Sequence, residues 1–327
     1  MAPASTNTGI PKDSCVLVTG VNGYVASHMA EQLLQQGYKV CGTVRDPSKS
    51  QWIEHLSHEK YGGDRFELAR VEDMTALGAF DQAVKGMSGV AHVATILGHT
   101  PVLITGVIST NRSLLISAAR EDTIKRFVYT SSSEAATLSS FSEHQEGSSM
   151  SISANAWNEE ATLGEQEIWK WAAENRPGFF INTVLPSVCF GASIDANSQG
   201  HSSSSGWPAA IFRNQFDQVW PFLQHIIPKG AYYVDVEDVA LLHVAGLTHP
   251  EVKNERLFAF GNPFTWHEVV SIYHELPGAN KMVHYDIGPD ARAQDLLRVM
   301  GKPGWSTLED TLMANVSDIF QATEQTG

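Results

Sequence analysis

The chain has 327 residues, of which 43% are apolar and 18% are charged. Its 36 acidic residues outnumber its 22 lysines and arginines, so the formal net charge is −14. This balance excludes nucleic acid as an expected partner, because phosphate backbones are bound through clustered positive charge.

The length predicts a globular protein of two coupled lobes. The N-terminus lacks a basic start followed by an apolar run, and no stretch approaches the roughly eighteen continuous apolar residues of a membrane span. We therefore expect a cytoplasmic protein with no membrane partner. The three cysteines lack metal-ligand spacing, so no metal site is predicted, and Cys15, Cys41 and Cys189 are expected to be structural thiols.

Short apolar runs alternate with helical patterns through the first half, which is typical of βαβ units and a parallel sheet. Strands are predicted at 15–19, 39–44, 65–71, 89–94, 126–131 and 179–186, with helices near 24–36, 76–86, 107–121 and 162–175. This order predicts an α/β fold in which residues 1–186 form a Rossmann-type, doubly wound parallel sheet.

Residues 187–327 are predicted to form a smaller, C-terminal substrate lobe, with 231–260 returning to the sheet. The pattern there predicts a strand at 231–236 and helices at 236–247 and near 305–322. Two Ser-rich segments, 137–157 and 193–207, interrupt the rhythm and are expected to be mobile loops.

The first predicted strand leads directly into a glycine-containing turn and then a helix, the arrangement of a dinucleotide-binding fingerprint. Gly20 permits the tight turn, Gly23 lets the backbone approach a pyrophosphate, and Ala26 lets the helix pack close to the strand. The helix N-terminus would then present its unsatisfied N–H groups to the anion. The same pattern in other contexts is only an ordinary glycine turn, and the order of strand, turn and helix favours the nucleotide site.

The end of the second predicted strand indicates which nucleotide is bound. Arg45 occupies the position that carries the ribose-binding carboxylate in an NAD site, and a guanidinium there suits a 2′-phosphate. The sequence therefore predicts NADP(H). Asp46, the next residue, keeps NAD open as an alternative, and a merely solvated arginine at a strand end is the third possibility.

Seven motifs follow one another along the chain: TGVNGYVASH, GTVRD, VEDM, GVAHVAT, KRFVYTSS, TVLP and the late GKPGW. With these in place, residues 12–320 resemble the extended short-chain dehydrogenase/reductases. Within that family the chain is similar to the fungal and plant aldehyde, ketone and dihydroflavonol reductases. The resemblance implies an oxidoreductase that acts on a small molecule of secondary metabolism.

The resemblance also implies roles for individual residues, carried over motif by motif. Ser132 matches the catalytic serine, Asp73 with Met74 would contact adenine, and Arg45 would bind the 2′-phosphate. Ser205, Trp207 and Tyr232 would lie where the substrate lobe closes over the cofactor. The remaining expected cofactor-binding residues are Gly20, Asn22, Gly23, Tyr24, Val25, Ala94, Thr95, Thr130, Pro186 and Val188.

One feature of the family is absent from the sequence. Its members place a lysine four residues after a tyrosine, so that the lysine lowers the pKa of a phenol that donates a proton to the nascent alkoxide. No tyrosine here has a lysine at that spacing; the residues found there are His28, Gly42, Arg65, Ser133, Val236, Glu237, Pro277 and Pro289.

The gap is expected between WNEE and TLGEQEIWKW, where Ala161 joins directly to Thr162. Thr162 and Glu165 are predicted to form a capping box that starts the shortened helix. A stable natural variant and a misassembled gene sequence both remain open as explanations.

Three residues are candidates for replacing the lost acid: Glu134, which follows Ser132 closely, His144 in a predicted loop, and Glu159. Each could equally be a solvated surface residue, and Lys170 and Trp169 are expected to be a surface lysine and a packing aromatic.

Three functions are therefore open. The leading one is NADPH-dependent reduction of a ketone or aldehyde on an apolar small molecule, with a non-standard active site. The second is a redox-silent enzyme that uses the same pocket for cyclisation, isomerisation or dehydration. The third is a binding protein that senses NADP(H).

Overall fold

A computed structural model of the chain describes residues 9–95, 101–136, 151–152, 156–158, 163–227, 230–274, 286–287 and 290–324. The chain divides into two compact units. Unit 1 comprises Met1–Ser131, Glu159–Val184 and Ala240–Arg256, and unit 2 comprises Ser132–Asn158, Leu185–Val239 and Leu257–Gly327. The chain therefore crosses between the two units five times rather than at one boundary.

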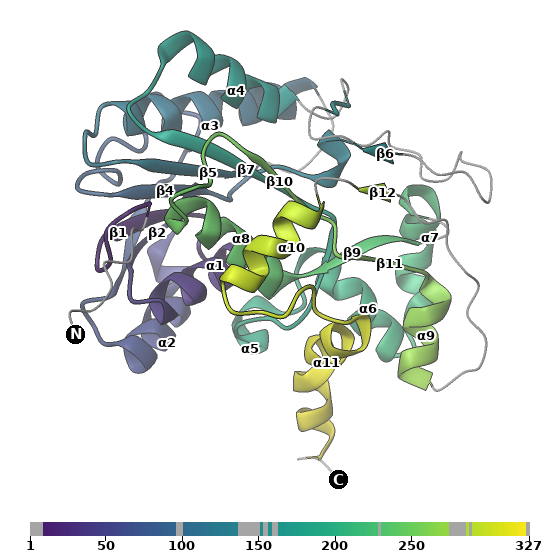
Figure 1. The fold of residues 1–327 in the computed structure, drawn as a ribbon. Helices are drawn as coiled ribbons and strands as arrows, with labels where there is room; N and C mark the ends of the chain where they lie inside the picture. Colours follow the sequence, from purple (N-terminus) through teal and green to yellow (C-terminus); the bar gives the residue numbers. More distant parts are fainter. Residues whose placement is uncertain are drawn as a thin grey trace, which may run out of the picture. The chain divides into compact units, whose positions relative to one another are not determined.

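The main sheet has seven strands in the order β10-β7-β5-β4-β1-β2-β3. From β3 to β7 every neighbouring pair is parallel. The strand order reverses between β1 and β4, the point at which open α/β sheets bind ligands beyond the carboxyl ends of the strands (Figure 1). These strands are β1 (Cys15–Thr19), β2 (Lys39–Val44), β3 (Phe66–Arg70), β4 (Gly89–His92), β5 (Arg126–Thr130), β7 (Phe180–Pro186) and β10 (Arg256–Ala259).

Four helices accompany the strands of the first half, and all six predicted strands are present. The helices are α1 (Tyr24–Gln35), α2 (Gln51–Tyr61), α3 (Pro101–Ala119) and α4 (Leu163–Asn175), with a short 3-10 helix, η1 (Pro47–Lys49), before α2. The predicted Rossmann-type doubly wound fold is confirmed.

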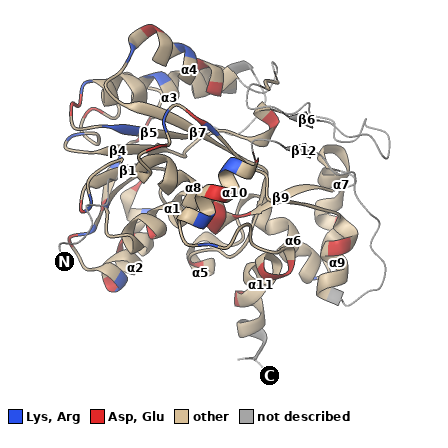
Figure 2. Cartoon of the chain, viewed as in Figure 1, with Lys and Arg blue, Asp and Glu red and all other residues tan. Residues whose placement is uncertain are grey.

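Strands β1 and β2 are nearly continuous runs of buried residues because helices cover both faces of a parallel sheet. Red and blue segments in Figure 2 accordingly lie mainly on helices and loops, and the strands are mostly tan. One cluster packs α3 and α4 against the sheet; among its members are Leu17, Val90, Leu114, Leu115, Phe127, Ile168, Trp171 and Ile181.

The helix predicted near 76–86 is wrong. This segment is a succession of turns, with amides bonding mainly to carbonyls three residues back, as Asp81 does to Gly78 at 3.0 Å. Gly78 (φ +78°) and Gly86 (φ +71°) adopt the left-handed conformation, which ends helical propagation. The apolar spacing that suggested a helix is used instead to bury Phe80 and Val84 in the core.

Outside the main sheet and its helices, the described residues contain two small sheets and seven further α-helices. One sheet has the order β11-β9-β8, and the other pairs β12 with β6. The strands are β6 (Ser151–Ile152), β8 (Val188–Phe190), β9 (Ala231–Asp235), β11 (Asn262–Phe264) and β12 (Asp286–Ile287). The helices are α5 (Ala196–Gln199), α6 (Gly206–Phe212), α7 (Phe216–Ile226), α8 (Val236–Thr248), α9 (Trp266–His274), α10 (Asp290–Val299) and α11 (Leu308–Glu324), with η2 (Ser133–Ala135) and η3 (Ser203–Ser205).

The Ser-rich segment 193–207 was expected to be a loop, but it contains α5, η3 and the start of α6. Its serine hydroxyls bond to nearby backbone carbonyls, as Ser193 does to Gly200 (2.6 Å) and Ser204 does to Cys189 (2.6 Å). Serine stabilises tight turns in this way. The loop was predicted from the serine content alone, which does not distinguish a loop from short helices joined by such turns. The other Ser-rich segment, 137–157, lies almost entirely outside the described residues.

The described helices include none that is both long and apolar enough to cross a membrane. Cys41 and Cys189 are buried and Cys15 is half-buried. Burial raises the pKa of the Cys15 thiol to about 11 and that of Cys189 to about 12. These thiols are therefore unreactive near neutral pH, in keeping with a structural role.

Candidate functional site

The glycine turn after β1 has the geometry that a phosphate-binding turn needs. Gly20 has φ +63°, and a Cβ there would lie 2.9 Å from Cβ of Ala94. The amide of Gly23 donates to the Gly20 carbonyl (2.8 Å), and the amide of Ser27 donates to the Gly23 carbonyl (2.9 Å) to begin α1. The N-cap residue of α1 is Gly23, which has no side chain to cap the helix, and the first turn holds no acidic residue, an arrangement that suits an anion at the amide end.

A buried threonine ties this turn to the end of β4. The Thr19 hydroxyl oxygen accepts hydrogen bonds from the amides of Val93 and Ala94, both at 3.0 Å. It also lies 3.0 Å from Nδ1 of His92. The turn and Ala94, one of the expected cofactor-binding residues, are thus held together within unit 1.

His92 continues this network inward. Its Nε2 lies 3.0 Å from Oδ1 of Asn111, whose Nδ2 donates to the carbonyl of Gly164 in α4 (3.0 Å). Burial lowers the pKa of His92 to about 4, so the imidazole is neutral at physiological pH. A chain of hydrogen bonds therefore links the glycine turn to the first turn of α4, a connection that no sequence motif indicated.

The side chains of Arg45 and Asp46 differ in the contacts that they make with the described part of the protein. Arg45 is exposed, and its side chain has no hydrogen bond or ion pair with any residue that the structure describes. The Asp46 carboxylate instead caps η1, accepting hydrogen bonds from the amide (3.0 Å) and the hydroxyl (2.7 Å) of Ser48. These bonds lower the pKa of Asp46. The available group at the end of β2 is thus the cation.

The other residues expected to contact the nucleotide have mixed surroundings. The Asp73 carboxylate accepts hydrogen bonds from the amide (2.9 Å) and hydroxyl (2.6 Å) of Thr75, which lower its pKa and shape the turn after β3. Met74 packs partly against the core. Tyr24 is buried and its ring stacks edge-on against His28. Asn22 and Thr95 are exposed, and Val25 is half-buried.

The chain that follows β5 carries the candidate catalytic serine. Thr130 closes the strand, with its hydroxyl 2.7 Å from Nε2 of His243. Ser132 is half-buried and caps η2, and its hydroxyl oxygen accepts a hydrogen bond from the amide of Glu134 (3.2 Å). Within the described residues the Ser132 O–H has no acceptor, so it can donate to another group. Glu134 itself is exposed.

Glu165 in α4 is buried, and the sequence did not predict the contacts that its carboxylate makes. It was predicted to cap its own helix with Thr162, which lies outside the described residues. Its carboxylate instead forms a bidentate ion pair with Arg256 (2.8 and 3.1 Å) and accepts a hydrogen bond from Ser131 Oγ (2.7 Å). Trp169, expected to be a packing aromatic, also donates its indole N–H to this carboxylate (3.2 Å).

In unit 2, Pro186 ends β7 and Val188 begins β8 beside β9. The Tyr232 ring packs against Phe260 in a buried cluster, and its backbone carbonyl accepts the Ser187 hydroxyl (2.7 Å). Trp207 is half-buried, with its ring 6.1 Å from that of Phe222. Tyr232 therefore presents little surface to a ligand, whereas Trp207 is partly accessible.

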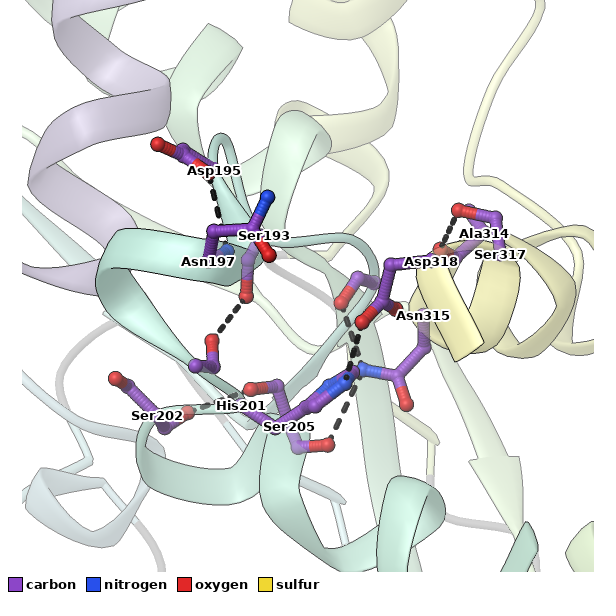
Figure 3. A network of polar contacts seen from close by, with 12 residues as sticks. Ser193, Asp195, Asn197, His201, Ser202, Ser205, Ala314, Asn315, Ser317 and Asp318 are labelled. Atoms are coloured by element: carbon purple, nitrogen blue, oxygen red, sulfur yellow. Dashed lines mark hydrogen bonds and ion pairs between the residues drawn. The ribbon is translucent and has the colours of Figure 1, made fainter. Parts of the chain in front are cut away.

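Ser205 belongs to the polar network drawn in Figure 3. It is fully buried, its hydroxyl donates to the Ser202 carbonyl (2.6 Å), and its own carbonyl accepts from Nδ2 of Asn315 (3.2 Å). In the same network, Nε2 of His201 lies 3.2 Å from Oδ2 of Asp318. The Asn315–Ser205 and His201–Asp318 contacts join the 193–207 segment to α11. Ser205 therefore helps to hold this segment against α11 within unit 2.

Two of the proposed replacements for the lost acid, His144 and Glu159, lie outside the described residues. Lys170 is exposed, as expected for a surface lysine. No group of three or more His, Cys, Asp or Glu side chains in the described part of the chain could hold a metal ion.

The glycine turn and strand order define a Rossmann-fold nucleotide-binding protein. The sequence model of the NAD dependent epimerase/dehydratase family matches residues 16–259. The chain therefore belongs to this family, the extended short-chain dehydrogenase/reductases, as its motifs predicted.

Its relatives include fungal reductases. Ketoreductase adrE of Penicillium rubens is 36% identical, with 94% of this chain and 97% of the relative covered. Aldehyde reductase 2 of Sporidiobolus salmonicolor is 34% identical, with 94% and 96% covered. Among solved structures, Gre2 of Candida albicans in complex with NADPH superposes with a TM-score of 0.79 at 22% identity, covering 95% of this chain and 99% of that one.

The alignment with ketoreductase adrE is longer than this chain. The match to ketoreductase adrE extends over 346 positions, whereas this chain has 327 residues. At least 19 positions of the alignment therefore have no residue of this chain opposite them. The relative therefore carries insertions with respect to this chain.

Proposed function

We propose that the protein reduces a ketone or aldehyde group on an apolar small molecule, with NADP(H) as cofactor and a non-standard active site. The observation that carries this proposal is the state of Ser132. Its hydroxyl oxygen accepts from the Glu134 amide (3.2 Å) and its O–H lacks an acceptor among the described residues. It follows the carboxyl end of β5, at the ligand-binding edge of a parallel sheet, and it matches the catalytic serine of the family.

The preference for NADP(H) rests on the contrast between Arg45 and Asp46. An exposed guanidinium without a protein partner can bind a 2′-phosphate, whereas a carboxylate that already caps η1 is less available to a ribose hydroxyl. The cofactor-binding residues that we propose are those predicted from the sequence, with the N-terminus of α1, which begins after the N-cap Gly23, next to the pyrophosphate.

Within this proposal each group has a distinct task. The bound cofactor supplies hydride. The chain supplies a hydrogen bond from Ser132 to the carbonyl oxygen, which stabilises the negative charge that develops there. Because no tyrosine and lysine are paired at the required spacing, the proton comes from water or from another residue, for which Glu134 and His144 are our candidates.

The absence of that pair also supports a second candidate function, in which the same pocket performs a reaction without net hydride transfer. Cyclisation, isomerisation or dehydration can proceed with groups that orient and polarise a substrate, and these do not need the tyrosine to protonate an alkoxide. An NADP(H)-sensing protein is the remaining alternative.

The test is to mix purified protein and NADPH with a panel of aldehydes and ketones and to follow both cofactor absorbance and product. Cofactor oxidation matched by alcohol formation supports reduction. Product without cofactor oxidation supports the redox-silent reaction, and binding without product supports the sensor. We expect simple carbonyls to be poor substrates, since a positioned acid contributes about 10²–10⁴-fold. Turnover of simple carbonyls at about 1–10³ per second would refute the non-standard site.

A further inference from the structure

We infer that Glu165 is a positioning residue that acts through Ser131 on the candidate catalytic Ser132, an inference that rests on the function proposed above. Glu165 and its ion-pair partner Arg256 are almost fully buried, with 1% and 8% of their side chains exposed. They lie far apart in the sequence and come together within unit 1.

Five hydrogen bonds converge on the Glu165 carboxylate. Oε2 accepts from Ser131 Oγ (2.7 Å) and from Nη2 of Arg256 (3.1 Å). Oε1 accepts from Nε of Arg256 (2.8 Å), from Thr183 Oγ1 (2.8 Å) and from the indole of Trp169 (3.2 Å). Every donor requires an acceptor, and a carboxylate is the side chain that presents acceptors alone at both ends.

Ser131 is thereby held at two points. Its hydroxyl binds Glu165, and its amide donates to the carbonyl of Val184 in β7 (2.8 Å). Thr183, the neighbour of Val184, is bound to the same carboxylate. Since Ser132 is the next residue in the chain, the direction in which the backbone leaves Ser131 determines where the Ser132 hydroxyl lies. The carboxylate thus orients Ser132 without touching a reacting atom.

The position of Glu165 explains why this device matters in a chain without the usual segment before α4. The helix begins at Leu163, so Glu165 belongs to its first turn. Its carboxylate links that turn to the end of β5 through Ser131 and to the start of β10 through Arg256. The order of the chain at the end of β5 therefore depends on Glu165, Ser131 and Arg256, which are all present.

The neighbouring Glu167 provides a matched control. It lies on the same helix and pairs with Arg112, whose side chain is 51% exposed. Glu167→Gln makes the same chemical change, from carboxylate to amide, in an ion pair that has no link to Ser131. In Glu165→Gln the new NH₂ group must face a donor of Ser131, Thr183 or Arg256, which breaks the arrangement.

The experiment compares Glu165→Gln, Ser131→Ala, the double variant and Glu167→Gln in the full chain. Hydrogen exchange measured by mass spectrometry over 131–136 should accelerate about threefold or more in the first three and stay unchanged in Glu167→Gln. With a carbonyl substrate, kcat should fall about 10- to 100-fold in both single variants, because misplacing a catalytic group is costly. KM for NADPH should change less than about twofold, and the double variant should be no slower than the slower single one.

Additive losses in the double variant, or exchange at 131–136 equal to wild type in Ser131→Ala, would overturn the inference. If Glu165→Gln does not fold, Ser131→Ala, which removes a single hydroxyl, still decides between these outcomes. If the wild-type protein reduces no carbonyl, the proposed function fails, and the exchange measurement alone decides whether Glu165 orders the segment that carries Ser132.

Discussion

The two glycines of the proposed phosphate-binding turn, Gly20 and Gly23, should respond differently to substitution. Gly23 has φ −80° and ψ 164°, an extended conformation that valine favours. The nearest atom to a Cβ at Gly23 would be the Gly20 carbonyl oxygen, at 3.1 Å. Gly23→Val should therefore retain the fold, at a cost of about 1 kcal/mol in the free energy of unfolding. Its branched side chain would occupy the space in which a pyrophosphate meets the backbone.

Gly20→Ala should instead destabilise the protein. With φ +63° the substitution costs about 1–2 kcal/mol in backbone energy. Overlap with Cβ of Ala94, 2.9 Å away, adds about 1–3 kcal/mol. The free energy of unfolding should thus fall by about 2–5 kcal/mol, well beyond the effect of Gly23→Val.

Gly23→Val should weaken cofactor binding strongly, although its effect on the free energy of unfolding is small. A charge-assisted hydrogen bond contributes about 1.5–3 kcal/mol, so losing two of them weakens NADPH binding about 10²- to 10⁴-fold. Denaturant unfolding followed by circular dichroism measures stability, and titration calorimetry measures the dissociation constant. Wild-type affinity in Gly23→Val, or a loss of stability equal to that of Gly20→Ala, would refute this assignment of the turn.

Three further outcomes are expected. Arg45→Ala should weaken NADPH binding by about one to two decades and leave NADH binding unchanged, measured by calorimetry; equal effects on both cofactors would remove Arg45 from the 2′-phosphate site. Ser132→Ala should slow carbonyl reduction about 10²- to 10³-fold in steady-state assays, and an unaffected rate would move the active site elsewhere. The pKa of His92 is about 4 in the folded protein against 6.5 unfolded, so the unfolded state binds the proton more readily between these values. The contribution of His92 to stability should therefore fall by on the order of 3 kcal/mol as pH decreases from 6.5 to 4, measured as the difference between wild type and His92→Gln in denaturant unfolding at matched pH; an equal pH dependence in the two proteins would contradict this.

The strands of the main sheet and the glycine turn could be predicted because their signals are local. Strands β1, β2, β5 and β7 were expected within one residue of their observed bounds, since buried parallel strands are short apolar runs. The glycine turn was recognised because strand, glycines and helix are contiguous in the chain. The same reasoning failed at 76–86, where apolar residues with helical spacing line a series of turns, and at 193–207, where serine hydroxyls stabilise turns by binding backbone carbonyls.

The surroundings of individual side chains depended on the tertiary structure. Arg45 and Asp46 are adjacent in the sequence, and only the fold reveals that Asp46 caps η1 while Arg45 has no partner among the described residues. The sequence by itself determined the family, the sheet and the absence of a Tyr-x-x-x-Lys pair. Only the tertiary structure decided what Glu165 does, because its partners Ser131, Thr183 and Arg256 come from the residue after β5, from β7 and from the start of β10, respectively. A buried carboxylate is stable only where donors converge on it, and no periodicity along the chain encodes that convergence.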